Sequence, residues 1–200
     1  GGREIITLAD GSQIELNTNT VLETQITKST RSVRLIRGEA YFRVRHDDSR
    51  PFVVMASGKS ITDLGTVFTV RNDAGSVRVA LLEGRARFDA GGKPVVMNPG
   101  DKIVATADRL TGLHDRPQTL AADLGWRRGV VVFKRTSLAQ VAAEFNRYNE
   151  TKLVIADPQI AELTVGGTFP ANNVELFGRI ASEILGLHVV HRENEIMISR

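Results

Sequence analysis

The stretch Leu81–Phe88 (LLEGRARF) has the alternating pattern of a β-strand, interrupted by a glycine and then resumed. Leu35–Phe42 (LIRGEAYF) has the same form, and Arg127–Phe133 (RRGVVVF) repeats it more loosely. The central glycines of the three stretches are 46 and 45 residues apart. Self-similarity at such a period favours stacked β units, as in a β-solenoid, over a single closed barrel. A β-sandwich is the alternative, because strand–glycine–strand turns occur in many β proteins.

The region around these stretches is typical of an all-β domain. Residues 4–110 contain short alternating segments, separated every 8–12 residues by turn signals such as Asp10-Gly11, Glu83-Gly84 and Asn98-Pro99-Gly100. No part of this region has a helical period. We therefore expect an all-β domain over residues 1–115, followed by a linker over residues 116–125.

Beyond the linker the hydrophobic period changes from that of strands to that of helices. Apolar residues fall on one helical face within Leu138–Tyr148 and again within Val174–Leu185. Ser137 is placed to cap the first helix, and Asn172 or Asn173 the second.

Each predicted helix lies between two predicted strands. Residues 126–200 therefore indicate a small two-layer domain of two β-α-β units, Val130–Ile155 and Leu163–Val190, followed by a terminal strand at Glu195–Ser199. The expected fold class of the whole chain is mainly β plus α+β.

Composition narrows the classes of function. The chain has 200 residues, no cysteine, and a net charge of +3 from 26 basic and 23 acidic residues spread along its length. A nucleic-acid-binding protein more often concentrates its basic residues on one element, so we expect no nucleic-acid partner. No apolar run approaches the ~18 residues that span a membrane. The start at Gly1-Gly2, with no initiator Met, predicts that the native chain extends upstream.

Residues that could carry catalysis or bind a metal lack the required spacing. His188 and His191 are three apart on a predicted strand and so point to opposite faces. Gly65-Thr66 lacks the other glycines and the lysine of a phosphate-binding loop, and no Gly-x-Ser-x-Gly motif is present. We expect no enzymatic activity, catalytic residue, cofactor, metal or small-molecule substrate. His46-Asp47-Asp48 is interpreted as a solvated turn.

Four motifs of the first region resemble the FecR domain. They are Pro51–Val54 (PFVV), Ile61–Val70 (ITDLGTVFTV), Leu82–Ala86 (LEGRA) and Asn98–Asp101 (NPGD). The Leu-Gly-Thr-x-Phe element, followed at this interval by Glu-Gly, is the most specific part of the match.

The second region resembles the C-terminal part of the same regulators. The match comprises Trp126-x-x-Gly129-x-x-x-Phe133, Phe145–Asn149 (FNRYN) and Gly166–Phe169 (GGTF). Its duplicated layout is similar to the short N-terminal domain of secretins and TonB-dependent transducers.

The resemblance implies the periplasmic region of a single-pass inner-membrane anti-sigma regulator. Such a region meets the signalling domain of an outer-membrane TonB-dependent siderophore transducer. Site-specific proteases then release an extracytoplasmic-function sigma factor, which binds a cytoplasmic segment that this sequence does not include. The alternative is a structural or glycan-binding β module of an envelope or secretion complex.

We expect partner binding in the second region, because small two-layer domains leave sheet edges open to a partner strand. The first choice is the segment Leu163, Thr164, Val165, Gly166, Gly167, Thr168 and Phe169, although its glycines are equally compatible with a bulge or turn. The second choice is the terminal strand, with Ile196 and Ile198. Trp126 and Phe133 are expected to pack between the two domains.

Overall fold

The computed structural model describes residues 2–63, 65–73, 75–115, 120 and 123–200. The chain divides into two compact units, one within residues 2–120 and the other within residues 121–200. Six residues of the expected linker, 116–119, 121 and 122, lie outside the described residues.

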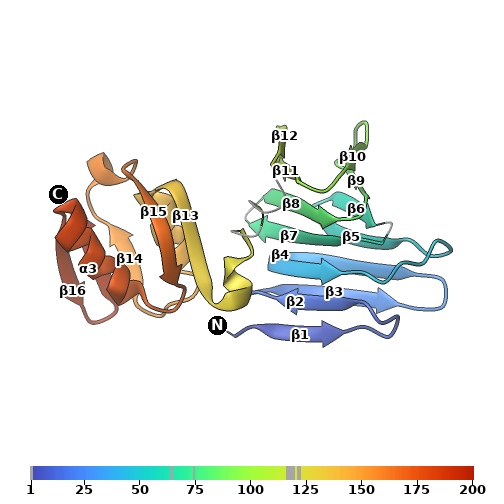
Figure 1. The fold of residues 1–200 in the computed structure, drawn as a ribbon, viewed down its shortest axis with the longest axis horizontal. Coiled ribbons are helices and arrows are strands. Elements are labelled where there is room, and N and C mark those ends of the chain that lie inside the picture. The colour runs from blue at the N-terminus through green and yellow to red at the C-terminus, as the bar shows by residue number, and fades with distance from the viewer. Residues whose placement is uncertain (1, 64, 74, 116–119, 121–122) are drawn as a thin grey trace. The chain divides into compact units, whose positions relative to one another are not determined.

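The N-terminal unit is built of β-strands apart from Leu120, and the strands run in layers one above another (Figure 1). Its strands are β1 (Glu4–Thr7), β2 (Gln13–Leu16), β3 (Val21–Ile26), β4 (Arg31–Arg43), β5 (Phe52–Ala56), β6 (Lys59–Asp63), β7 (Val67–Asp73), β8 (Ser76–Glu83), β9 (Ala86–Asp89), β10 (Val95–Met97), β11 (Asp101–Ala105) and β12 (Leu110–His114). They form one twelve-stranded sheet, whose main path is β10-β9-β6-β5-β4-β7-β8-β11-β12. Among its described residues, only β4 and β5 pair in parallel, so the expected solenoid is not confirmed and the structure is a curled mixed sheet.

The sheet branches at the long strand β4. Residues 31–37 of β4 pair with β3, and residues 31–34 pair also with β5. Residues 38–43 pair with β7, and residues 40–43 pair also with β2. A single core receives side chains from both branches. Phe42 stacks on Phe68 with ring centroids 4.9 Å apart, and it meets the edge of Phe52 at 6.4 Å.

Two glycines of the sequence repeat mark crossings between the branches. Gly38 lies at the middle of β4 with φ 91°, and Gly84 lies between β8 and β9 with φ 82°. A Cβ on Gly38 would lie 2.6 Å from the Cα of Thr20, and one on Gly84 would lie 2.5 Å from the carbonyl oxygen of Gly65. The two glycines of the repeat therefore lie at tight bends where a residue with a side chain would not fit. The third glycine, Gly129, has a different role, since it ends a 3₁₀ turn with open space around it.

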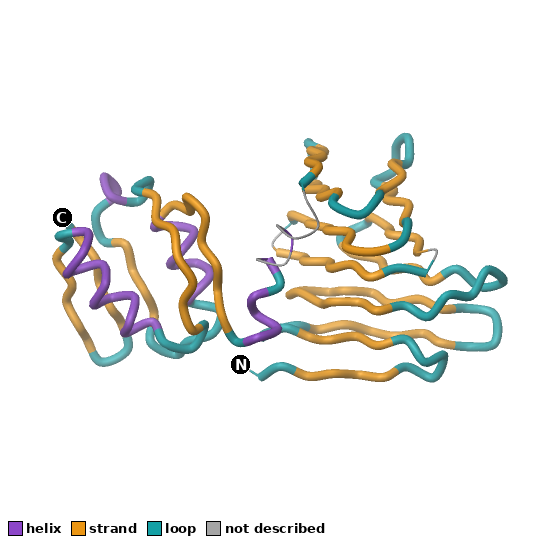
Figure 2. The backbone as a smooth tube through the Cα atoms, viewed as in Figure 1, coloured by secondary structure: helices purple, strands orange, loops and turns teal. Residues whose placement is uncertain are grey.

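The described residues of the C-terminal unit include the helices α2 and α3 and two small sheets (Figure 2). Its elements are η1 (Gly125–Arg128), β13 (Val130–Ser137), α2 (Leu138–Phe145), β14 (Lys152–Ile155), η2 (Pro158–Ile160), β15 (Thr164–Pro170), α3 (Val174–Leu185), β16 (His188–Arg192) and β17 (Glu195–Ser199). The sheets are β13-β15 and β14-β17-β16. The strand and helix order is as expected, but the two β-α-β units do not each form one sheet. Each helix instead joins a strand of the first sheet to a strand of the second.

Local sequence explains where the helices begin. The Ser137 hydroxyl accepts a bond from the amide of Gln140 at 3.4 Å, and the Asn173 side chain accepts one from the amide of Leu176 at 3.0 Å. Of the two possible caps of the second helix, Asn173 is therefore the one used.

Four phenylalanines hold this unit together. Phe145 of α2 lies 5.6 Å from Phe133, 6.2 Å from Phe169 and 5.3 Å from Phe177, measured between ring centroids. The two strands β13 and β15 and both helices thus share one apolar core.

Candidate docking edge

The first-choice segment forms most of β15, which pairs on one side with β13. Within the part of the chain that the structure describes, no strand pairs with its other side. Val165 and Phe169 turn toward the core, whereas Thr164 and Thr168 are exposed. β15 therefore has a free edge of the kind to which a partner strand can add.

The hydrogen bond made by Ala171, the residue after β15, shows which way the backbone amides of this strand point. The amide of Ala171 donates to the carbonyl of Gly129 at 2.9 Å, toward the β13 side. Amides alternate in direction along a strand, so the Phe169 amide also faces β13 and the Thr168 amide faces the free edge. Pro170, which has no amide hydrogen, occupies a position whose amide would face outward.

Both ends of β15 are fixed to the rest of the unit. The amide of Leu138, at the start of α2, donates to the carbonyl of Leu163 at 2.9 Å. At the other end the Asn149 side-chain amide donates to the carbonyl of Ala171 at 2.8 Å. The strand is thus held in place, so an added strand would meet a preorganised edge.

The two glycines of this segment differ in their surroundings. Gly167 has φ 150°, and a Cβ there would lie 2.9 Å from the ring of Phe169. Around Gly166 the nearest atom to such a Cβ is the carbonyl oxygen of Phe133, at 3.7 Å. A side chain at Gly167 would therefore collide with the Phe169 ring in the core, whereas Gly166 has room for a Cβ.

The glycines of this segment are also compatible with a bulge or turn. A bulge is present, but it lies in the neighbouring strand β13. The register of β13 against β15 shifts between Phe133 and Thr136. Arg135, within that interval, has φ 50°. The irregularity lies in β13, so β15 itself stays extended.

The prediction of an open docking edge at the terminal strand is wrong. The terminal strand β17 is the centre of its sheet and pairs with β14 on one side and β16 on the other. Ile196 and Ile198 are completely buried in the core. The last strand of the chain is thus inserted between β14 and β16, which precede it in the sequence. Short-range sequence patterns do not indicate such pairing.

The residues expected between the domains are both buried. Phe133 lies in the phenylalanine core of the C-terminal unit. Trp126, in η1, is 7% exposed, and among the described residues its indole N–H has no hydrogen-bond acceptor. The packing of Trp126 between domains stays a prediction.

The FNRYN motif has a structural role. The Asn146 side chain donates to the carbonyl of Leu153 at 2.9 Å and accepts from the amide of the same residue at 2.7 Å. The Lys152 ammonium donates to the carbonyls of Asn146 and Asn149, at 3.0 and 2.8 Å. Asn146 thus acts as a strand partner for β14 and fixes the loop after α2.

The Asp-Leu-Gly-Thr motif of the first region is a buried turn. The Asp63 carboxylate, 1% exposed, accepts hydrogen bonds from the amide of Gly65 at 3.1 Å and from the hydroxyl of Thr66. Leu64 lies outside the described residues. The described part of the motif therefore lies in the connection between β6 and β7, and its Asp63 and Thr66 side chains are buried.

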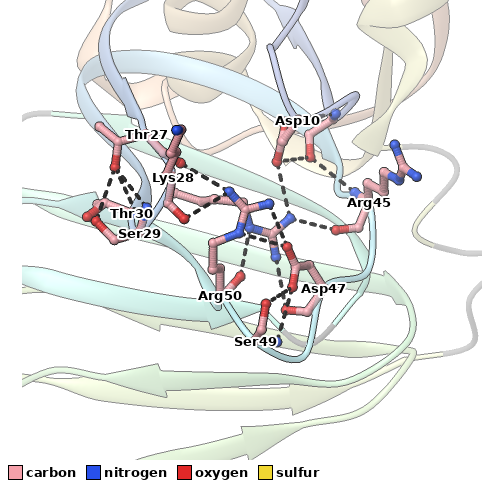
Figure 3. Close-up of polar contacts among 11 residues, drawn as sticks. Asp10, Thr27, Lys28, Ser29, Thr30, Arg45, Asp47, Ser49 and Arg50 are labelled. Carbon is pink, nitrogen blue, oxygen red and sulfur yellow. Dashed lines mark hydrogen bonds and ion pairs between the residues drawn. The ribbon is translucent and has the colours of Figure 1, made fainter.

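A buried polar cluster that the sequence analysis missed joins three segments of the β unit (Figure 3). The Arg31 guanidinium bonds Asp10 at 3.1 Å, and it donates to the carbonyls of Arg50 and Arg45, each at 2.7 Å. Burial raises the pKa of Asp10, but hydrogen bonds from Ser12 and Arg31 outweigh that effect and hold the pKa below its ordinary value.

The turn at His46-Asp47-Asp48 belongs in part to this cluster. Asp47 accepts hydrogen bonds from Ser49 at 2.6 Å and from Arg50 at 2.7 Å. These bonds hold the pKa of Asp47 well below its ordinary range. Asp47 is therefore an anchored residue, and the expectation of a simply solvated turn is wrong for it.

Among the described residues, no group of three or more His, Asp or Glu side chains is placed to hold a metal ion. No helix in the described parts of the chain is long and apolar enough to cross a membrane.

Comparison with known proteins gives a family match within the N-terminal unit. Residues 1–87 match the family described as FecR protein, which confirms the expected resemblance of the first region to the FecR domain. Two crystal structures of a candidate anti-sigma factor from Parabacteroides distasonis ATCC 8503 share the fold. Their TM-scores are 0.84 and 0.83, with 23% identity over 100% of this chain and 95% of theirs. No curated protein matches the sequence.

Proposed function

We propose that this chain, whose residues 1–87 match the FecR protein family, is the periplasmic signalling region of a membrane-anchored anti-sigma regulator. The family match supports a regulatory, non-enzymatic role. In this proposal the C-terminal unit binds the signalling domain of an outer-membrane TonB-dependent siderophore transducer. Site-specific proteolysis of the regulator then releases an extracytoplasmic-function sigma factor held by its cytoplasmic segment.

The observation that supports binding by the C-terminal unit is the free edge of β15. The strand is fixed at both ends, its outer amides include that of Thr168, and its exposed side chains are small. A strand of the transducer domain would add to this edge through main-chain hydrogen bonds. Specificity would come from side chains on either face of the extended sheet.

The test is calorimetry with the purified signalling domain of the cognate transducer. Thr168→Pro removes an amide that faces the free edge and leaves the bonds to β13, so we expect it to weaken binding by about tenfold or more. Thr168→Ala keeps the amide and is the matched control, with binding close to that of the unchanged chain. Circular dichroism of both variants checks the fold.

Three outcomes would contradict the proposal. One is an absence of binding by the intact, folded chain. Another is equal binding by Thr168→Pro and Thr168→Ala, which would move the interface away from β15. Binding to a peptidoglycan fragment without binding to the transducer domain would support the envelope-module alternative instead.

A further inference from the structure

Two hairpins end the β unit on the side away from β1. The first consists of β9 and β10 and ends one branch of the sheet, and the second consists of β11 and β12 and ends the other (Figure 1). A groove of about 310 Å³ lies between their turns, with Phe88 and Ala105 among its lining residues. Both of these residues are buried parts of the core, so the groove has an apolar floor.

Apolar side chains are exposed around this groove. Val95 and Leu110 line it and are 38% and 46% exposed. Val96 and Leu113, on the same two end strands, are 58% and 60% exposed. Within the described parts of the chain, β10 and β12 have no strand on their outer sides. Such a concentration of exposed apolar residues at open strand edges is typical of an interaction surface.

The charges at the groove are mainly positive. Lys59, Lys93 and Arg109 line it together with one carboxylate, that of Asp108. The ammonium of Lys59 donates to the carbonyl of Ser57 at 3.4 Å. Among the described residues, the side chains of Lys93 and Arg109 make no hydrogen bond or ion pair. These two cations therefore stand on either side of the groove and are free to meet carboxylates of a partner.

We propose that this groove is a second docking surface, which binds an extended acidic segment of a partner protein. Alternate side chains of the segment would place carboxylates against Lys93 and Arg109 and apolar groups against Val95 and Leu110. The concave shape favours a peptide over a membrane, because a lipid surface would need a broader basic face than two unpaired cations. The site is distinct from the β15 edge and does not depend on it.

The test uses the full chain and a synthetic peptide that alternates Glu and Val, with fluorescence anisotropy as the measurement. The double variant Lys93→Glu with Arg109→Glu should weaken binding by about tenfold or more. The double variant Arg3→Glu with Lys28→Glu changes the net charge equally and is the matched control, because both side chains are exposed and lie outside the groove. The control should bind the peptide as the unchanged chain does, and so should Thr168→Pro.

Leu110→Ser tests the apolar contribution separately. It should weaken binding of the Glu-Val peptide and leave the fold unchanged by circular dichroism, since the side chain is exposed.

Several results would overturn the proposal. Equal binding of a peptide that alternates Lys and Val would remove the role of charge. Equal weakening by the two double variants would show a non-specific effect of net charge. Self-association of the chain that Lys93→Glu with Arg109→Glu abolishes, without peptide binding, would assign the groove to a second copy. Binding to vesicles of anionic lipid without peptide binding would assign it to a membrane.

Discussion

The Arg31 guanidinium and the Asp10 carboxylate form an ion pair of 3.1 Å whose side chains are 2% and 4% exposed. Arg31 lies at the start of β4, and its guanidinium also bonds two carbonyls of the segment before β5. Asp10 is itself held by the amide and hydroxyl of Ser12. One buried cation therefore connects the β1–β2 turn, the start of β4 and the loop after β4.

Removal of the Asp10 carboxylate should be strongly destabilising. Asp10→Ala leaves the Arg31 charge buried without its counter-ion, and we expect a loss of about 3 kcal/mol in the free energy of unfolding. The control is Glu23→Ala, which breaks an ion pair with Arg34 of 3.9 Å between side chains 68% and 64% exposed. That change should cost less than about 1 kcal/mol. Urea unfolding measures both, and equal losses would contradict the role of burial.

The contribution of Asp10 should also depend on pH. Its pKa is lower in the folded chain than the ordinary value of 3.8. The stabilisation is therefore fully present above that value and is lost as the pH falls through the lower, folded pKa. The difference in stability between the unchanged chain and Asp10→Asn should shrink on acidification below 3.8. Urea unfolding at a series of pH values tests this, and a difference that grows in acid would contradict it.

The bend at Gly38 should tolerate no side chain. Gly38→Ala forces an alanine to φ 91° and places its Cβ against the backbone of Thr20. We expect a loss of about 3 kcal/mol or more. Gly58→Ala is the control, since Gly58 has φ 74° but nothing within 4 Å of an added Cβ, and it should cost about 1 kcal/mol. Thermal unfolding compares the two, and similar losses would show that only the backbone angle matters.

Sequence patterns predicted the local features of this chain well. The all-β character of the first region, the helix caps at Ser137 and Asn173, and the order of elements after Val130 all follow from residues close together in the chain. These features depend on periodicity and on side-chain bonds to nearby amides, which a single sequence records directly.

Long-range pairing was not predictable in the same way. Nothing in the composition of β4 indicates that its two halves pair with different strands, and nothing in Glu195–Ser199 indicates that it is inserted between β14 and β16. Arg31, the buried partner of Asp10, is 21 residues away in the sequence, so local patterns did not indicate this ion pair either. Of the candidate docking residues, the β15 segment keeps a free edge because, among the described residues, β15 pairs with β13 alone in a two-stranded sheet.

The FNRYN motif offers a direct test of its structural role. Asn146→Ala removes both hydrogen bonds that the side chain makes to the backbone of Leu153. We expect a loss of about 1–3 kcal/mol, because the amide and carbonyl of Leu153 are part-buried and lose their partners. Asn172→Ala, at an exposed position next to α3, should change stability by less than about 0.5 kcal/mol. If both variants unfold alike in urea, the motif has no such role.

Alanine substitutions at the two adjacent glycines of β15 should differ in their effect on stability. Gly167→Ala places a Cβ 2.9 Å from the Phe169 ring, which cannot move freely because it packs against Phe133, Phe145 and Phe177. We expect a loss of about 1–3 kcal/mol in the free energy of unfolding. Gly166→Ala meets no such obstacle, so its fold should be kept, with a smaller change measured by urea unfolding. A larger loss at Gly166 than at Gly167 would mean that the Phe169 ring is not what requires glycine in this strand.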